Sequence, residues 1–152
     1  MEAFRLSRQK FAGTLSGKGA AIKGARWNST GVELIYTASN RSLAMAEVAV
    51  HLTIATLPDD YVMMTIYVPD DISLQKVSAP SLPEDWNTYP IPSFTQTIGD
   101  QFIRDLKYCV LQVPSAVTQG DYNLLINPFH PEFSGIKIID AVKFPFDKRI
   151  FK

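Results

Sequence analysis

Three residues in the first third of the chain have side chains that could act together on a charged small molecule: Arg26, Tyr36 and Glu47. Glu47 is a lone carboxylate in the apolar run from Leu43 to Ile54, where an acid is costly unless it finds a polar partner or faces a cleft. A guanidinium, an aromatic ring and a confined carboxylate are what a protein needs to hold and cleave a charged nucleotide. The pattern therefore indicates an active site.

Each of these residues also has a plain structural interpretation. Arg26 would form a salt bridge, Trp27 would lie in the core, and Tyr36 would be a strand aromatic with a satisfied hydroxyl. The order along the chain favours a site, because a strand carrying Tyr36 runs almost directly into a helix carrying Glu47. The two side chains would converge at one end of a sheet, and the glycines around Arg26 would let the backbone approach a ligand closely.

Apolar β-branched and aromatic runs predict more strands than helices. Helices are expected from a cap at Ser39 or Asn40 to about Thr56, before Pro58, and from Ile98 to Lys107 with Thr97 as cap. The other segments are a loop with one helical turn at 7–23, a proline-rich surface loop at 79–93, and strands at 4–6, 32–37, 61–68, 72–77, 109–113, 123–126 and 136–144. A regular βαβ alternation is missing, so the prediction is an α+β domain with a mixed sheet and flanking helices.

Size and charge narrow the class of protein. The 152 residues fit one compact domain, expected to span 1–152, and the 46% apolar content argues against disorder. A formal net charge of zero argues against direct binding to nucleic acid or to a membrane surface. The chain has neither an apolar run of transmembrane length nor an N-terminal signal pattern, and its only cysteine, Cys109, reads as a buried core thiol, so a cytoplasmic location is expected.

Two other motifs suggest a phosphate-binding loop and a metal site, but each is incomplete. The glycine-rich stretch from Gly13 to Gly19 is one residue short of a phosphate-binding loop and has Gly19 where Ser or Thr should hold magnesium. Glu47 and His51 share a helix face four residues apart and could offer two metal ligands. A local Glu47–His51 contact is the simpler interpretation, since His130 is the only other histidine and is expected in a turn. No metal is expected.

Ser115 follows Pro114 at the end of an expected strand. A nucleophilic serine needs an adjacent base, and neither histidine is placed nearby in the sequence. No glycines of a nucleophile elbow flank it either. A hydrogen-bonding role for Ser115 is therefore favoured over a serine-hydrolase role.

Taken together, these motifs resemble the RES-domain proteins, toxins of bacterial type II toxin–antitoxin pairs whose partner is an Xre-type helix-turn-helix antitoxin. The name-giving arginine, glutamate and serine would be Arg26 in Gly-Ala-Arg-Trp-Asn, Glu47 in Ala-Met-Ala-Glu-Val and Ser115 in Val-Pro-Ser-Ala-Val. The resemblance covers nearly the whole chain, and its further matches are 4–6, 15–17, 35–38, 99–100, 123–128, 130–131 and 144–149.

The resemblance implies an ADP-ribosyltransferase-like fold and an enzyme that consumes NAD as substrate and needs no cofactor. Glu47 would stabilise the oxocarbenium character that develops when the nicotinamide–ribose bond breaks. Arg26 would bind the anionic dinucleotide and Tyr36 would orient the nicotinamide end. Ser115 would form a hydrogen bond within the site, and Arg5 would be a second cation. Gly24, Trp27 and Asn28 would shape the pocket.

The resemblance leaves the acceptor open. NAD glycohydrolase activity is the leading expectation, with transfer of ADP-ribose to a protein and phosphorolysis as alternatives. A catalytically inactive, partner-binding module is the non-enzymatic alternative, and the intact Arg26, Tyr36 and Glu47 argue against it. A homodimer and an antitoxin that covers the active site are the expected assemblies.

Overall fold

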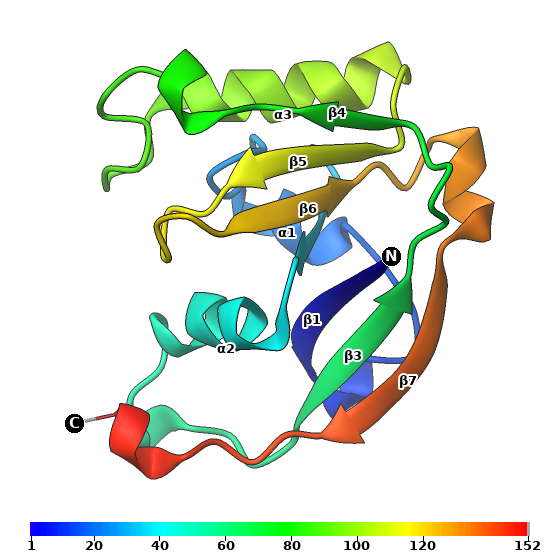
Figure 1. The fold of residues 1–152 in the computed structure, drawn as a ribbon. Helices are drawn as coiled ribbons and strands as arrows, with labels where there is room; N and C mark the ends of the chain where they lie inside the picture. Colours follow the sequence, from blue (N-terminus) through cyan, green and yellow to red (C-terminus); the bar gives the residue numbers. More distant parts are fainter. Residues whose placement is uncertain (152) are drawn as a thin grey trace.

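The computed structural model describes residues 1–151 and forms one mixed seven-stranded sheet with three α-helices (Figure 1). The α+β class expected from the sequence is confirmed. The strands are β1 (Glu2–Arg8), β2 (Ile35–Ala38), β3 (Tyr61–Tyr67), β4 (Leu74–Lys76), β5 (Val110–Pro114), β6 (Tyr122–Ile126) and β7 (Lys137–Lys143). The helices are α1 (Lys18–Lys23), α2 (Arg41–Ala49) and α3 (Ser93–Asp105).

The sheet has the order β4-β5-β6-β2-β1-β3-β7, and within residues 1–151 only the β4–β5 pair is parallel. Its two halves are joined weakly, because β1 and β2 share one residue pair, Phe4 with Ala38. Figure 1 shows the β4–β5–β6 half turned steeply away from the β1–β3–β7 half, with α2 in the angle between them. Residues of β1, β2 and α2 line a pocket at this junction.

Three apolar clusters stabilise this arrangement. One packs α2 against β1 and β3 through Leu43, Ala44, Phe4, Leu6 and Met63. A second packs Phe102 of α3 and Trp27 against the inward residues of β5 and β6. The third lies on the other side of the central strands and contains the fully buried Cys109, as expected.

Helix α2 begins where the sequence predicts and ends early. The Asn40 side chain accepts a 2.8 Å hydrogen bond from the Leu43 backbone N–H, which confirms the cap. The expected end near Thr56 is wrong, because the chain turns at 50–52 and then forms a separate 3-10 turn at Ile54–Thr56. The hydrophobic run alone does not mark that break.

Helix α3 begins at Ser93, five residues before the predicted Ile98. Thr97 is not its cap, since the Thr97 hydroxyl donates to the Ser93 carbonyl from within the helix. The buried face at Thr95, Gly99 and Phe102 explains why the helix extends back to the proline that precedes it. Pro114, expected to end the strand before it, is the last residue of β5 and pairs with Tyr122.

Elsewhere the boundaries move by a few residues. β1 is longer than the expected 4–6, while β2 and β4 are shorter than expected. The loop at 7–23 contains α1 and a 3-10 turn, and 79–93 is mainly irregular as expected. No helix in residues 1–151 is long and apolar enough to cross a membrane.

Candidate active site

A pocket of about 160 Å³ opens at the junction of β1, β2, β6 and α2. Sites that enclose a whole drug-sized ligand measure roughly 300–1,000 Å³, so this pocket fits one end of an extended ligand. Its position follows from the fold, since α2 covers the angle between the two halves of the sheet (Figure 1). The lining residues are Phe4, Arg5, Leu6, Tyr36, Thr37, Ala38, Ala44, Glu47, Val48 and Asn123.

Glu47 presents a partly buried carboxylate to this pocket from the last turn of α2. Burial raises the pKa of Glu47, because a charged carboxylate loses hydration there. Hydrogen bonds from Ser115 and Asn123 and the charges of His51 and Arg26 oppose that rise. His51 itself is exposed just beyond the helix. The ionisation of Glu47 in this pocket therefore depends on its burial and on these four neighbouring side chains.

Ser115 lies directly behind Glu47, just after β5. Its hydroxyl oxygen accepts hydrogen bonds from the backbone N–H groups of Val117 (3.1 Å) and Thr118 (3.0 Å). With both lone pairs occupied, the hydroxyl proton points to Glu47 Oε1 at 3.2 Å. Ser115 is thus a fixed donor to the carboxylate, in keeping with the hydrogen-bonding role predicted from its sequence.

Asn123 is a site residue for which sequence reasoning assigned no role. It lies on β6 opposite Ala38, is buried, and donates from Nδ2 to the Thr37 carbonyl at 3.2 Å. It also lines the pocket beside Glu47 and helps to hold down the pKa of that carboxylate. The available signal was an amide in the otherwise apolar run 123–126, where a buried polar side chain needs a partner.

Tyr36 is both a residue of the pocket and a strand aromatic with a satisfied hydroxyl, the two roles considered from the sequence. It lines the pocket from β2, while its hydroxyl donates to Asn28 Oδ1 at 2.6 Å and accepts from the Trp27 backbone N–H at 3.0 Å. Burial raises the pKa of Tyr36, so the phenol stays protonated. The structure therefore gives Tyr36 a fixed ring and a satisfied hydroxyl.

Arg26 is oriented by the long loop before α3. Its Nη1 group donates to the carbonyls of Trp86 (2.9 Å) and Thr88 (3.1 Å) in place of the salt bridge considered from the sequence. Burial lowers the pKa of Arg26, and the nearby Glu47 and Tyr36 oppose that change. The guanidinium thus lies within electrostatic range of the pocket carboxylate although it does not line the pocket.

The loop that carries Arg26 is held by its own residues. Asn28 is fully buried and donates from Nδ2 to the carbonyls of Ala20 (3.0 Å), Ser29 (3.3 Å) and Val32 (3.0 Å). Trp27 is buried against Trp86 with ring centroids 6.1 Å apart, and Gly24 has a φ of 74° that favours glycine. In this structure Gly24, Trp27 and Asn28 interact with other parts of the chain. Their direct contact with a substrate stays a prediction.

Arg5 brings a second cation to the pocket from β1. Its Nη1 donates to the Ser16 carbonyl at 3.4 Å, and burial lowers the pKa of Arg5. The structure therefore brings Arg5, Tyr36 and Glu47 to one pocket, with Ser115 behind it and Arg26 beside it. A carboxylate in a pocket lined by one guanidinium group, with a second within electrostatic range, suits an anionic ligand that develops positive charge next to the carboxylate.

The chain belongs to the RES-domain family, whose model matches residues 2–147. It is 38% identical to the Prs ADP-ribosylating toxin of Sphingobium sp. over 93% of this chain and 89% of that protein. It is also 34% identical to Toxin Res of Photorhabdus laumondii, over 100% of this chain and 98% of the relative.

A solved structure supports the fold independently. The chain resembles one in the crystal structure of the M. tuberculosis MbcT–MbcA toxin–antitoxin complex, with a TM-score of 0.73. The similarity covers 94% of this chain and 83% of the other at 20% identity, so it bears on the fold alone.

Proposed function

We propose that the protein is the toxin of a toxin–antitoxin pair and that it degrades NAD by cleaving the nicotinamide–ribose bond with water as acceptor. The observation that carries this proposal is Glu47, a partly buried carboxylate held by a hydrogen bond from Ser115 in a pocket that Arg5, Tyr36 and Asn123 also line. The family match and the names of the relatives support the same class of chemistry.

Glu47 acts as an anion next to the reacting ribose. As the glycosidic bond to nicotinamide breaks, positive charge develops on the ribose ring and its oxygen. A carboxylate already fixed in a partly dehydrated pocket stabilises that charge without having to reorganise. The Ser115 hydrogen bond keeps the carboxylate oriented, and Ser115 and Asn123 both favour its ionised form.

The arginines bind the dinucleotide. Both recorded hydrogen bonds of Arg26 use Nη1, so in the part of the chain that the structure describes Nε and Nη2 are left for a phosphate group. Arg5 contributes positive charge to the pocket from β1, and the Tyr36 ring orients the nicotinamide. The remaining part of NAD lies outside the small pocket.

Transfer of ADP-ribose to a protein is the second candidate function. It is favoured by the 38% identity with a relative named for ADP-ribosylating Prs. The two activities share the first half of the reaction and differ in the acceptor that reaches the ribose. Phosphate is a third acceptor, and it would yield ADP-ribose phosphate.

The experiment is a product analysis of purified protein incubated with NAD, with and without phosphate and with and without a bacterial lysate. Free nicotinamide and ADP-ribose in buffer alone would support the hydrolase, while a labelled protein band that needs lysate would favour transfer. Product formation by Glu47→Ala at the wild-type rate would overturn the mechanism. Intact NAD under every condition would favour an inactive binding module.

The partners are proposed with the function. An antitoxin of the Xre helix-turn-helix type would cover the pocket, the toxin would form a homodimer, and both would act in the cytoplasm. The fold neighbour comes from a toxin–antitoxin complex, which is why we propose an antitoxin partner; the Xre type and the covered pocket are proposed from the family resemblance. Co-expression of a helix-turn-helix protein from an adjacent gene should restore growth, and that protein should copurify with the toxin.

Ser115→Ala is expected to lower NAD cleavage about tenfold at neutral pH, the effect of losing one hydrogen bond to a charged group. Activity needs ionised Glu47, whose pKa is already raised by burial. Removing the Ser115 donor raises that pKa further, so the acid limb of the rate profile moves to higher pH. Ser115→Thr keeps the hydroxyl and should restore the profile. A lower rate with an unchanged acid limb would contradict the role assigned to Ser115.

A further inference from the structure

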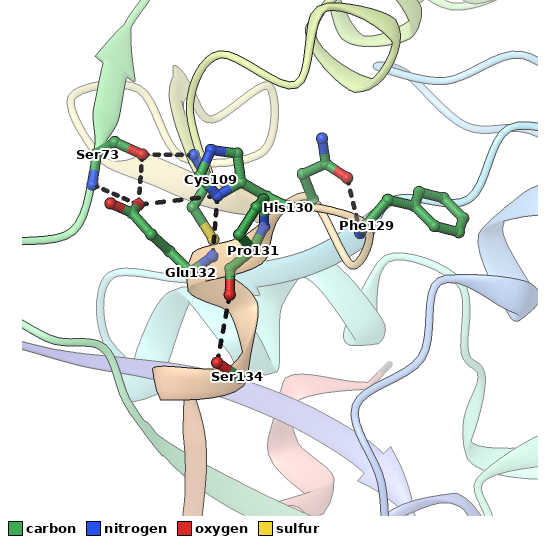
Figure 2. A network of polar contacts seen from close by, with 8 residues as sticks. Ser73, Cys109, Phe129, His130, Pro131, Glu132 and Ser134 are labelled. Carbon is green, nitrogen blue, oxygen red and sulfur yellow. Dashed lines mark hydrogen bonds and ion pairs between the residues drawn. The ribbon is translucent and has the colours of Figure 1, made fainter.

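A second cluster of chemically active side chains lies at the opposite end of β5 and β6 from the pocket. Cys109 precedes β5, while His130 and Glu132 follow β6 at the 3-10 turn Pro131–Gly135. Their potential ligand atoms all lie within 4.8 Å of one another (Figure 2). Because β5 and β6 are antiparallel neighbours, residues 21 or more positions apart in the sequence meet at this end.

The nitrogen and oxygen ligand atoms of this cluster already accept hydrogen bonds, as lone-pair donors to a metal ion must be able to do. His130 Nδ1 accepts the Glu132 backbone N–H at 3.1 Å, so this nitrogen carries a lone pair. Glu132 Oε2 accepts hydrogen bonds from the Ser73 backbone N–H and hydroxyl, which lower the pKa of Glu132 and keep it ionised. Figure 2 shows His130 and Glu132 facing one another, and Nδ1 and Oε2 are 3.8 Å apart.

Cys109 supplies the sulfur. Burial raises the pKa of its thiol to about 12, with a further contribution from the charge of Glu132, so the metal-free protein keeps the proton. The His130 side chain is 10% exposed and that of Glu132 is 41% exposed, which leaves access from the Glu132 side. A divalent cation that entered there would replace the thiol proton and remove the cost of placing a thiolate beside a carboxylate.

We propose that Cys109, His130 and Glu132 bind one Zn²⁺ ion. A thiolate, an imidazole and a carboxylate suit zinc, and a water molecule or the Ser73 hydroxyl would complete the tetrahedron. Tetrahedral N and O ligands of zinc lie about 3.3 Å apart, so His130 and Glu132 need to close by about 0.5 Å. On binding, the thiol releases its proton to solvent and the Glu132 N–H gives up its bond to Nδ1.

The proposed ion has a structural role. It would tie the starts of β4 and β5 to the turn after β6, because Ser73, Cys109 and Glu132 belong to those three segments. Five residues of β5 separate Cys109 from Ser115, so the two residues lie about 20 Å apart along the strand. The zinc site is therefore independent of the proposed NAD chemistry, and its test needs no activity assay.

The test uses tag-free protein, dialysed first against a chelator and then loaded with Zn²⁺ or Co²⁺. We expect one zinc ion per chain by elemental analysis, a higher melting temperature, and a thiolate-to-cobalt charge-transfer band in the Co²⁺ form. Cys109→Ser should abolish the band, and Glu132→Gln should weaken zinc binding at least about tenfold. Glu132→Gln is a near-isosteric change, since its amide oxygen still accepts the hydrogen bonds from Ser73.

His51→Gln is the matched control, because His51 is the only other histidine and is exposed. It should bind zinc as the wild type does. Folded wild type that retains no zinc would overturn the proposal. Zinc binding that survives equally in folded Glu132→Gln would also overturn it, and this variant decides the question if Cys109→Ser does not fold.

Discussion

Glu47→Gln is expected to slow NAD cleavage by about 100- to 1,000-fold, the usual cost of removing one preorganised electrostatic group from an active site. Glutamine keeps the size of the side chain and can still accept the Ser115 hydrogen bond, but it lacks the negative charge that the forming oxocarbenium ion needs. The measurement is single-turnover loss of NAD, together with growth arrest on expression of the protein.

The same substitution should make the fold more stable at neutral pH. The folded-state pKa of Glu47 is raised mainly by burial, so ionised Glu47 opposes folding above that pKa and protonation on lowering the pH relieves the effect. A neutral glutamine removes this cost permanently, and the melting temperature should rise while activity falls. Asp140→Asn, an exposed change on β7, is the control and should alter neither quantity.

A Glu47→Gln variant with undiminished NAD cleavage would remove Glu47 from the mechanism. A variant that is inactive and also melts at a lower temperature would instead mean that Glu47 supports the fold and that its charge is not what the activity needs. The two measurements together separate these outcomes.

The sequence predicts the elements well where one local signal decides them. The Asn40 cap and the continuous apolar run from Tyr61 to Tyr67 are local features, and the structure confirms both elements. The end of α2 and the start of α3 are not decided locally. They depend on the turn at 50–52 and on the packing of Thr95, Gly99 and Phe102 against the rest of the core.

The same distinction applies to the candidate site. The residue types of Glu47, Arg26 and Tyr36 are visible in the sequence, because charges and aromatic rings in an apolar context need partners. Their partners are not visible. The Trp86 carbonyl that orients Arg26 is 60 residues away, the Ser115 hydroxyl is 68 residues from Glu47, and Asn123 reaches the site only because β6 pairs with β2.

Gly99→Ala is expected to have the largest effect on stability among small substitutions, because α3 contacts the Arg26 loop at this glycine. A Cβ at position 99 would lie 1.6 Å from the Trp27 carbonyl oxygen and 2.7 Å from its carbon. Backbone atoms cannot rotate away, so α3 and the loop must separate. Overpacking of this kind costs about 1–3 kcal/mol and sometimes more. Thermal or urea unfolding measures the loss.

The displacement should also reduce activity through Arg26. The loop on both sides of Trp27 is bonded to α3, since Asp100 accepts from the Ser29 backbone N–H at 2.9 Å and Gln96 donates to the Ala25 carbonyl at 3.0 Å. Separating the two segments strains these bonds and moves Arg26 away from Trp86 and Thr88, which should raise KM for NAD more than it lowers kcat. Gly19→Ala is the matched control, because a Cβ there meets nothing within 4 Å and alanine favours the helix α1. If Gly99→Ala were as stable as Gly19→Ala, the close contact between α3 and Trp27 would not exist in solution, and the positioning of Arg26 would need another explanation.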